Sequence, residues 1–263
     1  MIQEQQKEFR RIEGVAEKAQ PFGIKSGSKT LVMLIHGFTG TPYDLHVLAD
    51  FLADNKLDVE VPLLAGHGGS TAMLYQTRNQ DWVKSVEDML EQKLKEYDKV
   101  FMIGYSFGSN ISLHLSTKYP QIAGIIALGI PIFIRNELQI RTLLPLARIF
   151  KKTYRKRWMN HEMTKEWSEQ GRHSHIPIPS IVTFYDFIDR YTKKELAKVQ
   201  APVLIVHSRD DLVSHPRGSE FLFKNLTVTD KHLFILNKQD HNPVHNTRRD
   251  FIFSKTLQFI ESH

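Results

Sequence analysis

Short, uninterrupted apolar segments recur along the chain and alternate with segments of helical periodicity. The expected strands occupy residues 30–37, 57–62, 99–104, 122–129, 201–208 and 232–237. The expected helices occupy residues 43–56, 81–97, 109–120 and 248–263. Strands that are apolar throughout are buried on both faces, and their alternation with helices is typical of a parallel sheet covered on both sides. The sequence therefore predicts an α/β fold with a mostly parallel central sheet.

The alternation breaks between about residues 131 and 200. This stretch has no clear strand, and its basic and aromatic composition follows a helical pattern that "HIPIPS" interrupts. Some 70 residues are too many for a connection between two core strands. Ligands of open α/β sheets bind beyond the carboxyl ends of the strands. We therefore expect a helical cap inserted over that end, with a second small domain of no catalytic role as the alternative.

The chain has 263 residues, enough for one large domain or two small ones. Residues 19–263, including the cap, are expected to form the α/β domain, and residues 1–18 a solvated helical extension. The chain carries 35 Lys and Arg against 29 Asp and Glu, a net charge of +6. No basic run is interleaved with aromatic residues as in a nucleic-acid surface, so no nucleic-acid partner is expected.

Cysteine is absent, which excludes disulfides, thiolate metal sites and a cysteine nucleophile. The N-terminal segment is charged and has no apolar core typical of a signal peptide. The longest apolar run, residues 122–134, is interrupted by Pro131 and is too short to span a membrane. We expect a cytoplasmic protein without stable membrane insertion, either a monomer or a homodimer.

The segment "GYSFG", residues 104–108, matches the pattern G-x-S-x-G. It follows the apolar segment "VFMI" and precedes a helical pattern. In such a strand–turn–helix elbow the serine Oγ projects above the sheet, and the flanking glycines allow the helix to approach its strand. We interpret Ser106 as a nucleophile; a glycine-rich turn without a chemical role is the alternative.

A serine hydroxyl needs a base, and in this fold the acid follows the serine and the histidine comes last. After the expected strand 201–208, "SRDDLV" offers Asp210 and Asp211. We favour Asp210, where the turn can aim a carboxylate at the histidine, and expect Asp211 to face solvent or to cap the next helix. After the last strand, His241 lies nearer the strand end than His245, and we favour it as the base.

The segment "HGFTG", residues 36–40, supplies a glycine-rich turn after the first buried strand. The backbone N–H of Phe38, together with that of Phe107 after the nucleophile, would form a two-donor oxyanion hole. For His36 we favour a structural role, hydrogen bonding to neighbouring loops.

Metal and cofactor sites are not expected. His173 and His175, or His241 and His245, have ligand-like spacing, but Pro243 disfavours a helical arrangement of the second pair and no H-E-x-x-H motif occurs. Neither a G-x-G-x-x-G nor a Walker loop is present, so no nucleotide cofactor is expected.

Several of these motifs, in this order, resemble the α/β-hydrolases, specifically the bacterial carboxylesterase and monoacylglycerol lipase group. The resemblance covers about residues 19–263 and is carried by "TLVMLIHGFTG", "GHG" at 66–68, "DWVKSVED", "KVFMIGYSFGS", "APVLIVHSRDDLV" and the late "DH". It implies a helical cap over an acyl-binding site. It also implies the following roles: nucleophile Ser106, acid Asp210, base His241, and oxyanion donors Phe38 and Phe107.

The sequence and the resemblance together predict a serine hydrolase without a cofactor. We expect it to cleave short- to medium-chain acyl esters or monoacylglycerols through an acyl-enzyme on Ser106. Thioesterase or C–C bond hydrolase activity on the same three residues is an alternative, as is a ligand-binding receptor with little turnover. Apolar cap residues, among them Ile132, Phe133 and Leu143, would line the acyl site or form the core of the cap itself.

Overall fold

The computed structural model describes residues 9–150, 152–156, 161–237, 241 and 248–263. Within them a seven-stranded sheet has the order β1-β3-β2-β4-β5-β8-β9. The strands, in spatial order, are β1 (Phe22–Ile24), β3 (Asp58–Val61), β2 (Thr30–Ile35), β4 (Lys99–Tyr105), β5 (Gly124–Leu128), β8 (Val203–Ser208) and β9 (Lys231–Leu236). Only the β1–β3 pair is antiparallel among these neighbours. The predicted α/β fold is confirmed, and the short edge strand β1 is the one strand of this sheet that the sequence pattern did not reveal.

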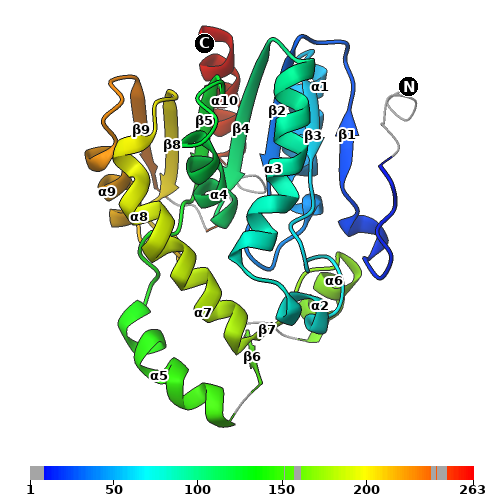
Figure 1. Ribbon diagram of the computed structural model, residues 1–263, viewed down its shortest axis with the longest axis vertical. Helices are drawn as coiled ribbons and strands as arrows, with labels where there is room; N and C mark the ends of the chain where they lie inside the picture. The colour runs from blue at the N-terminus through cyan, green and yellow to red at the C-terminus, as the bar shows by residue number, and fades with distance from the viewer. Residues whose placement is uncertain (1–8, 151, 157–160, 238–240, 242–247) are drawn as a thin grey trace.

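Helices cover both faces of the sheet (Figure 1). One face packs against α3 (Asn79–Glu96), α4 (Phe107–Ser116), α7 (Ile178–Phe187) and α9 (Arg217–Asn225). The other packs against α1 (His46–Asp54), which follows the 3-10 turn η2 (Pro42–Leu45), and α10 (Arg249–Ser262). Along β2, Met33 faces the first layer and Val32 and Leu34 the second, as the two-residue period of a strand requires.

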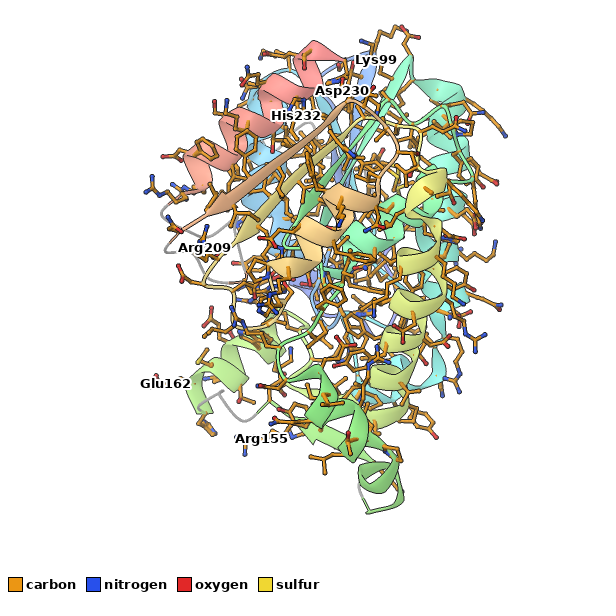
Figure 2. The ribbon with its side chains drawn as sticks, turned by 90° about the vertical axis from the view of Figure 1, so that its left-hand side faces the viewer. Lys99, Arg155, Glu162, Arg209, Asp230 and His232 are labelled. Atoms are coloured by element: carbon orange, nitrogen blue, oxygen red, sulfur yellow. The ribbon has the colours of Figure 1, made fainter. Side chains whose placement is uncertain are left out.

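The cap lies beyond the carboxyl ends of the strands. In Figure 2, Lys99 and Asp230 lie at one end of the molecule, and Arg155 and Glu162 of the cap at the other. The described cap elements are α5 (Glu137–Phe150), β6 (Thr153–Arg155), α6 (His161–Glu169), β7 (His175–Pro177), α7, the π-helical turn η3 (Ile188–Thr192), α8 (Lys193–Glu195) and η4 (Leu196–Lys198). The cap is therefore not wholly helical, because β6 and β7 pair as an antiparallel ribbon.

The N-terminal segment differs from the expected helix. Residues 1–8 lie outside the described part, and residues 9–16 contain no helix; a single 3-10 turn, η1, spans Glu17–Ala19. Gly14 has a φ of 76°, a conformation that ends a helical pattern. The segment also packs on the domain, since the N–H of Ala16 donates to the carbonyl of Gly68 at 2.8 Å and Ala19 is buried.

The helix α2 (Thr71–Gln76) completes the described helices, beside β7 at the cap. None of the helices in the described residues combines the length and the apolar character needed to cross a bilayer.

Candidate active site

Ser106 occupies a strained turn between β4 and α4. Its φ of 51° and ψ of −122° lie outside the regions that L-residues prefer. The turn is fixed by two backbone hydrogen bonds: the N–H of Ser106 donates to the carbonyl of Leu128 at 2.7 Å, and the N–H of Ser109 donates to the carbonyl of Ser106 at 2.9 Å. The surrounding structure thus holds a conformation that the residue would not adopt alone.

The glycines on either side of Ser106 are required by close packing. A Cβ on Gly104 would lie 2.2 Å from the backbone nitrogen of Ser109, and a Cβ on Gly108 would lie 2.0 Å from the carbonyl oxygen of Ile35. Both contacts are with backbone atoms, which cannot move aside cheaply. The pattern G-x-S-x-G therefore reflects how closely α4 approaches β4 and β2.

His241 lies beside Ser106 although 135 residues separate them. Its Nε2 is 2.9 Å from Ser106 Oγ, and its Nδ1 is 2.7 Å from Asp211 Oδ2. An imidazole that donates from Nδ1 to the carboxylate leaves Nε2 free to accept the serine proton. The structure therefore brings Ser106 and His241 together, whereas His245 lies outside the described residues.

Asp211, not Asp210, is the carboxylate that contacts His241. Asp211 is fully buried, whereas Asp210 is exposed. The prediction that Asp210 contacts the histidine is wrong. In the turn after β8 the side chain of Asp210 is exposed to solvent, and the side chain of Asp211 is buried. The N–H groups of Val213 and Ser214 hold that turn by donating to Asp211 Oδ1 at 2.7 and 2.9 Å.

Further side chains surround the carboxylate of Asp211. Ser214 Oγ donates to Oδ2 at 2.7 Å, and His207 Nε2 lies 3.3 Å from the same oxygen. Burial alone would raise the pKa of Asp211, but hydrogen bonds from His207, His241 and Ser214 outweigh burial and hold the pKa well below its usual range. The carboxylate thus stays ionised. The sequence analysis missed His207 and Ser214; the spacing D-x-x-S is the one local signal, typical of a turn anchored by the aspartate.

The loop at residues 36–40 lies directly against Ser106. A Cβ on Gly37 would lie 3.0 Å from Ser106 Cβ. The ring centroids of Phe38 and Phe107 are 6.1 Å apart. Phe107 is the first residue of α4, where backbone N–H groups have no partner within the helix. The two residues predicted as oxyanion donors therefore flank Ser106 on adjacent segments.

His36 has the structural role that the sequence suggested. Its Nε2 accepts the N–H of Leu64 at 3.0 Å, and its Nδ1 donates to the carbonyl of Gly37 at 2.9 Å. Burial lowers the pKa of His36 to about 4. A neutral imidazole therefore ties the loop at 36–40 to the segment after β3.

Aromatic side chains from α3, α4 and α7 pack around Phe38 of the loop. Phe38 stacks on Phe184 of α7 with ring centroids 5.0 Å apart, and it lies 5.4 Å from Trp82. Ser106 is only 8% exposed. The candidate site is thus an apolar, largely covered environment in which α7 forms one wall.

The apolar cap residues divide between core and surface. Ile132 is fully buried in the core, whereas Leu143 is 60% exposed. Phe133, Ile134 and Leu144 are partly buried against the core, and the side chains of Ile149 and Phe150 lie outside the described part. Ile132 therefore belongs to the core between the sheet and its helices, neither to the surface nor to a separate core of the cap.

Of the histidine pairs with ligand-like spacing, only His173 and His175 are both described, since His245 lies outside the described residues. His173 is buried and His175 is exposed. In the part of the chain that the structure describes, no three histidine, aspartate or glutamate side chains are placed to hold a metal ion.

Comparison with known proteins shows the family to which the chain belongs. The family model described as "Serine aminopeptidase, S33" matches residues 26–248. The chain belongs to this α/β-hydrolase family. A carboxylesterase of Bacillus subtilis (strain 168) is 27% identical to this S33 member over 244 residues, covering 92% of the chain and 96% of the relative. A thermostable monoacylglycerol lipase of Bacillus sp. (strain H-257) is 26% identical over 250 residues, covering 95% and 97%.

Solved structures agree with the S33 fold. A metagenome-derived lipolytic enzyme, from work on LipS and LipT, superposes with a TM-score of 0.84 at 23% identity, covering 95% of this chain and all of its own. A soluble variant of the Saccharomyces cerevisiae monoglyceride lipase superposes with a TM-score of 0.77 at 18% identity, covering 97% and 98%. The predicted membership of the carboxylesterase and monoacylglycerol lipase group is confirmed, and with it the prediction of an esterase- and lipase-like hydrolase.

Proposed function

We propose that the protein hydrolyses carboxylic esters through an acyl-enzyme on Ser106, with His241 as general base and Asp211 as its carboxylate partner. The observation that carries the proposal is one continuous chain of hydrogen bonds. Ser106 Oγ lies 2.9 Å from His241 Nε2, and His241 Nδ1 lies 2.7 Å from Asp211 Oδ2. These are the contacts by which a serine hydroxyl is activated near neutral pH.

In the first half of the reaction, Ser106 Oγ attacks the ester carbonyl carbon while its proton passes to His241 Nε2. Asp211 stabilises the imidazolium that forms and holds the tautomer with the proton on Nδ1. The tetrahedral intermediate collapses when the proton on Nε2 passes to the leaving alcohol oxygen and the acyl group stays on Ser106. Water then repeats the sequence, with His241 again as base, and releases the acid.

The negative charge on the carbonyl oxygen of the intermediate requires donors beside Ser106. We assign this role to the backbone N–H groups of Phe38 and Phe107. The position of Gly37 against Ser106 and of Phe107 at the start of α4 supports the assignment. Such preorganised donors stabilise charge strongly where water is excluded.

The substrate class follows from the walls of the site and from the relatives. The environment of Ser106 is apolar, because the rings of Phe38, Phe107 and Phe184 pack together beside it. An apolar environment suits an acyl chain. Both curated relatives are named as enzymes that act on carboxylic esters or monoacylglycerols. We therefore assign short- to medium-chain acyl esters or monoacylglycerols as substrates. The cytoplasmic location stays a prediction from the sequence.

Labelling with a fluorophosphonate tests the nucleophile directly. The wild-type protein is expected to bind one equivalent of label, and Ser106→Ala none. Ser109→Ala, a change at a buried serine three residues away that lacks contact with His241, serves as the control and is expected to keep the label. Equal labelling of wild type and Ser106→Ala would exclude the proposed acyl-enzyme.

A matched series of substrates tests the bond that is cleaved. We expect p-nitrophenyl esters and monoacylglycerols to be hydrolysed faster than the corresponding anilides and thioesters. A series of acyl-chain lengths on one alcohol then defines the acyl site. Preferred cleavage of the anilide would replace the ester by an amide substrate without changing the roles of the three residues.

A further inference from the structure

Polar contacts join the cap to the loop that carries Phe38. The N–H of His173 donates to the carbonyl of Thr39 at 3.1 Å, and the ammonium of Lys156 donates to Thr39 Oγ1 at 2.8 Å. Thr39 thus receives two hydrogen bonds from the cap, one on its backbone and one on its side chain. Both come from residues more than 100 positions later in the chain.

Thr39 has a backbone conformation that is unfavourable unless neighbouring contacts stabilise it. Its φ is 67°, in the left-handed region that a β-branched residue rarely adopts, and its side chain is 4% exposed. A conformation of this kind persists only where neighbouring contacts hold it. Thr39 directly follows Phe38, so these contacts restrain the loop from the residue next to the proposed oxyanion donor, through the Thr39 side chain and the Thr39–Gly40 peptide.

The ammonium of Lys156 lies among aromatic and charged side chains. Its ammonium lies 4.4 Å from the ring centroid of Trp167, and Arg172 covers the same ring at 5.1 Å. Asp44 forms an ion pair with Arg172 and is the carboxylate that attracts Lys156. Burial outweighs this attraction and lowers the pKa of Lys156 to about 7.

We propose that Lys156 is a positioning residue for the reaction, which holds Thr39 and through it the backbone N–H of Phe38 at the oxyanion site. The inference rests on the proposed function and goes beyond it, because it makes the contact of the cap with Thr39 a condition for full turnover. The alternative is that the neighbouring contacts, Thr41 Oγ1 to the carbonyl of Gln170 at 3.1 Å and the Asp44–Arg172 pair, hold the loop without Lys156.

Matched substitutions separate these two accounts. Lys156→Met removes the ammonium and keeps most of the apolar stem, and Thr39→Val removes the hydroxyl and keeps the β-branched shape. Lys156→Arg and Thr39→Ser restore a donor and an acceptor. Lys152→Met, at an exposed lysine of the same cap segment, is the control for loss of charge.

We expect Lys156→Met and Thr39→Val each to lower kcat about tenfold with KM changed less than twofold. Loss of a whole oxyanion donor lowers turnover roughly 10²–10³-fold, and misplacement of one lowers it less. Lys156→Arg, Thr39→Ser and Lys152→Met should stay within about threefold of wild type. Affinity for a trifluoromethyl ketone analogue of the tetrahedral intermediate should fall in proportion to kcat/KM.

Thermal unfolding distinguishes positioning from a structural role. Because Lys156→Met removes a buried cation, its melting temperature should equal or exceed that of wild type while kcat falls. The double variant Lys156→Met/Thr39→Val should be no slower than either single variant, since both act through one contact.

Three results would overturn the inference: kcat unchanged in Lys156→Met, losses that multiply in the double variant, or a loss of kcat with unchanged affinity for the ketone. None of these concerns the proposed function, which is tested by fluorophosphonate labelling of Ser106 in the wild-type protein.

Discussion

The carboxylate of Asp211 lies 2.7 Å from Nδ1 of His241, and the same oxygen accepts the hydroxyl of Ser214. Asp211→Asn keeps the size of the side chain but presents an amide that favours the wrong imidazole tautomer. We expect kcat for an activated ester to fall roughly 10⁴-fold. Asp210→Asn, at an exposed neighbour, should stay within about threefold. Steady-state kinetics of both variants measure this, and similar losses would contradict the assignment of Asp211.

His241 contacts both Ser106 and Asp211, so its removal leaves the serine without a base. His241→Ala should abolish ester hydrolysis above the activity of Ser106→Ala. His245→Ala should keep most of the activity. Kinetics with one p-nitrophenyl ester and fluorophosphonate labelling rates give the comparison. The reverse pattern would transfer the role of base to His245.

Ser214 donates to the buried charged oxygen of Asp211, whereas Ser219 bonds to the imidazole of His207 instead of the carboxylate, with Ser219 Oγ 2.6 Å from His207 Nδ1. Hydrogen bonds to charged groups contribute about 1.5–3 kcal/mol, and neutral ones about 1 kcal/mol. Ser214→Ala should therefore lower the free energy of unfolding more than Ser219→Ala. Urea unfolding at pH 7 measures both. A larger effect of Ser219→Ala would mean that Ser214 adds little to the support of Asp211.

The buried histidines make stability depend on pH. Burial lowers the pKa of His36 and of His173 to about 4, below the value of 6.5 in an unfolded chain. The unfolded chain therefore binds more protons between these values, and the folded state loses stability as the pH falls from 6.5 toward 4.

His36→Gln removes one of these groups. The loss of unfolding free energy between pH 7 and pH 4 should shrink by up to about 3 kcal/mol, although the variant is less stable at pH 7. Urea unfolding at several pH values measures this change. The same dependence of the unfolding free energy on pH in His36→Gln and in wild type would refute the expectation.

Gly108→Ala tests the packing of the elbow. The added methyl would meet the carbonyl of Ile35 at 2.0 Å, so α4 or β2 must shift. We expect a loss of about 3 kcal/mol in unfolding free energy and a large loss of turnover. Gly27→Ala has open space around it and only a positive φ of 78°, so its loss should be about 1 kcal/mol and its turnover normal. Equal effects would show that backbone conformation, not packing, decides at Gly108.

The central strands and Ser106 could be predicted from the sequence for local reasons. Strands such as β2 and β4 are buried on both faces after their first residues, Thr30 and Lys99, and the buried positions carry no charged side chain. Ser106 stands between such a strand and a helix, with glycines where two backbones meet. Each of these signals depends on neighbours in the chain.

The choice between Asp210 and Asp211 could not be made in that way. Both follow β8, and a turn has no periodicity that tells which side chain points inward. The turn is set by the N–H groups of Val213 and Ser214, which both bond to Asp211. The ribbon β6–β7 was missed because its strands have three residues each. The contact of Lys156 with Thr39 spans 117 positions and leaves no local pattern.

The helix α7 is part of both the cap and the hydrophobic core. It forms a wall of the covered site, and through η3, α8 and η4 it also leads the chain back to β8. Phe184, Phe187 and Ile188 are at most 8% exposed in the core. Lifting them into water would cost on the order of 5 kcal/mol, a large part of the stability of a typical domain.

The helix α7 is therefore a wall of the site that the domain core fixes in position. An acyl chain bound to Ser106 would lie against a surface whose shape is set by the folding of the whole domain.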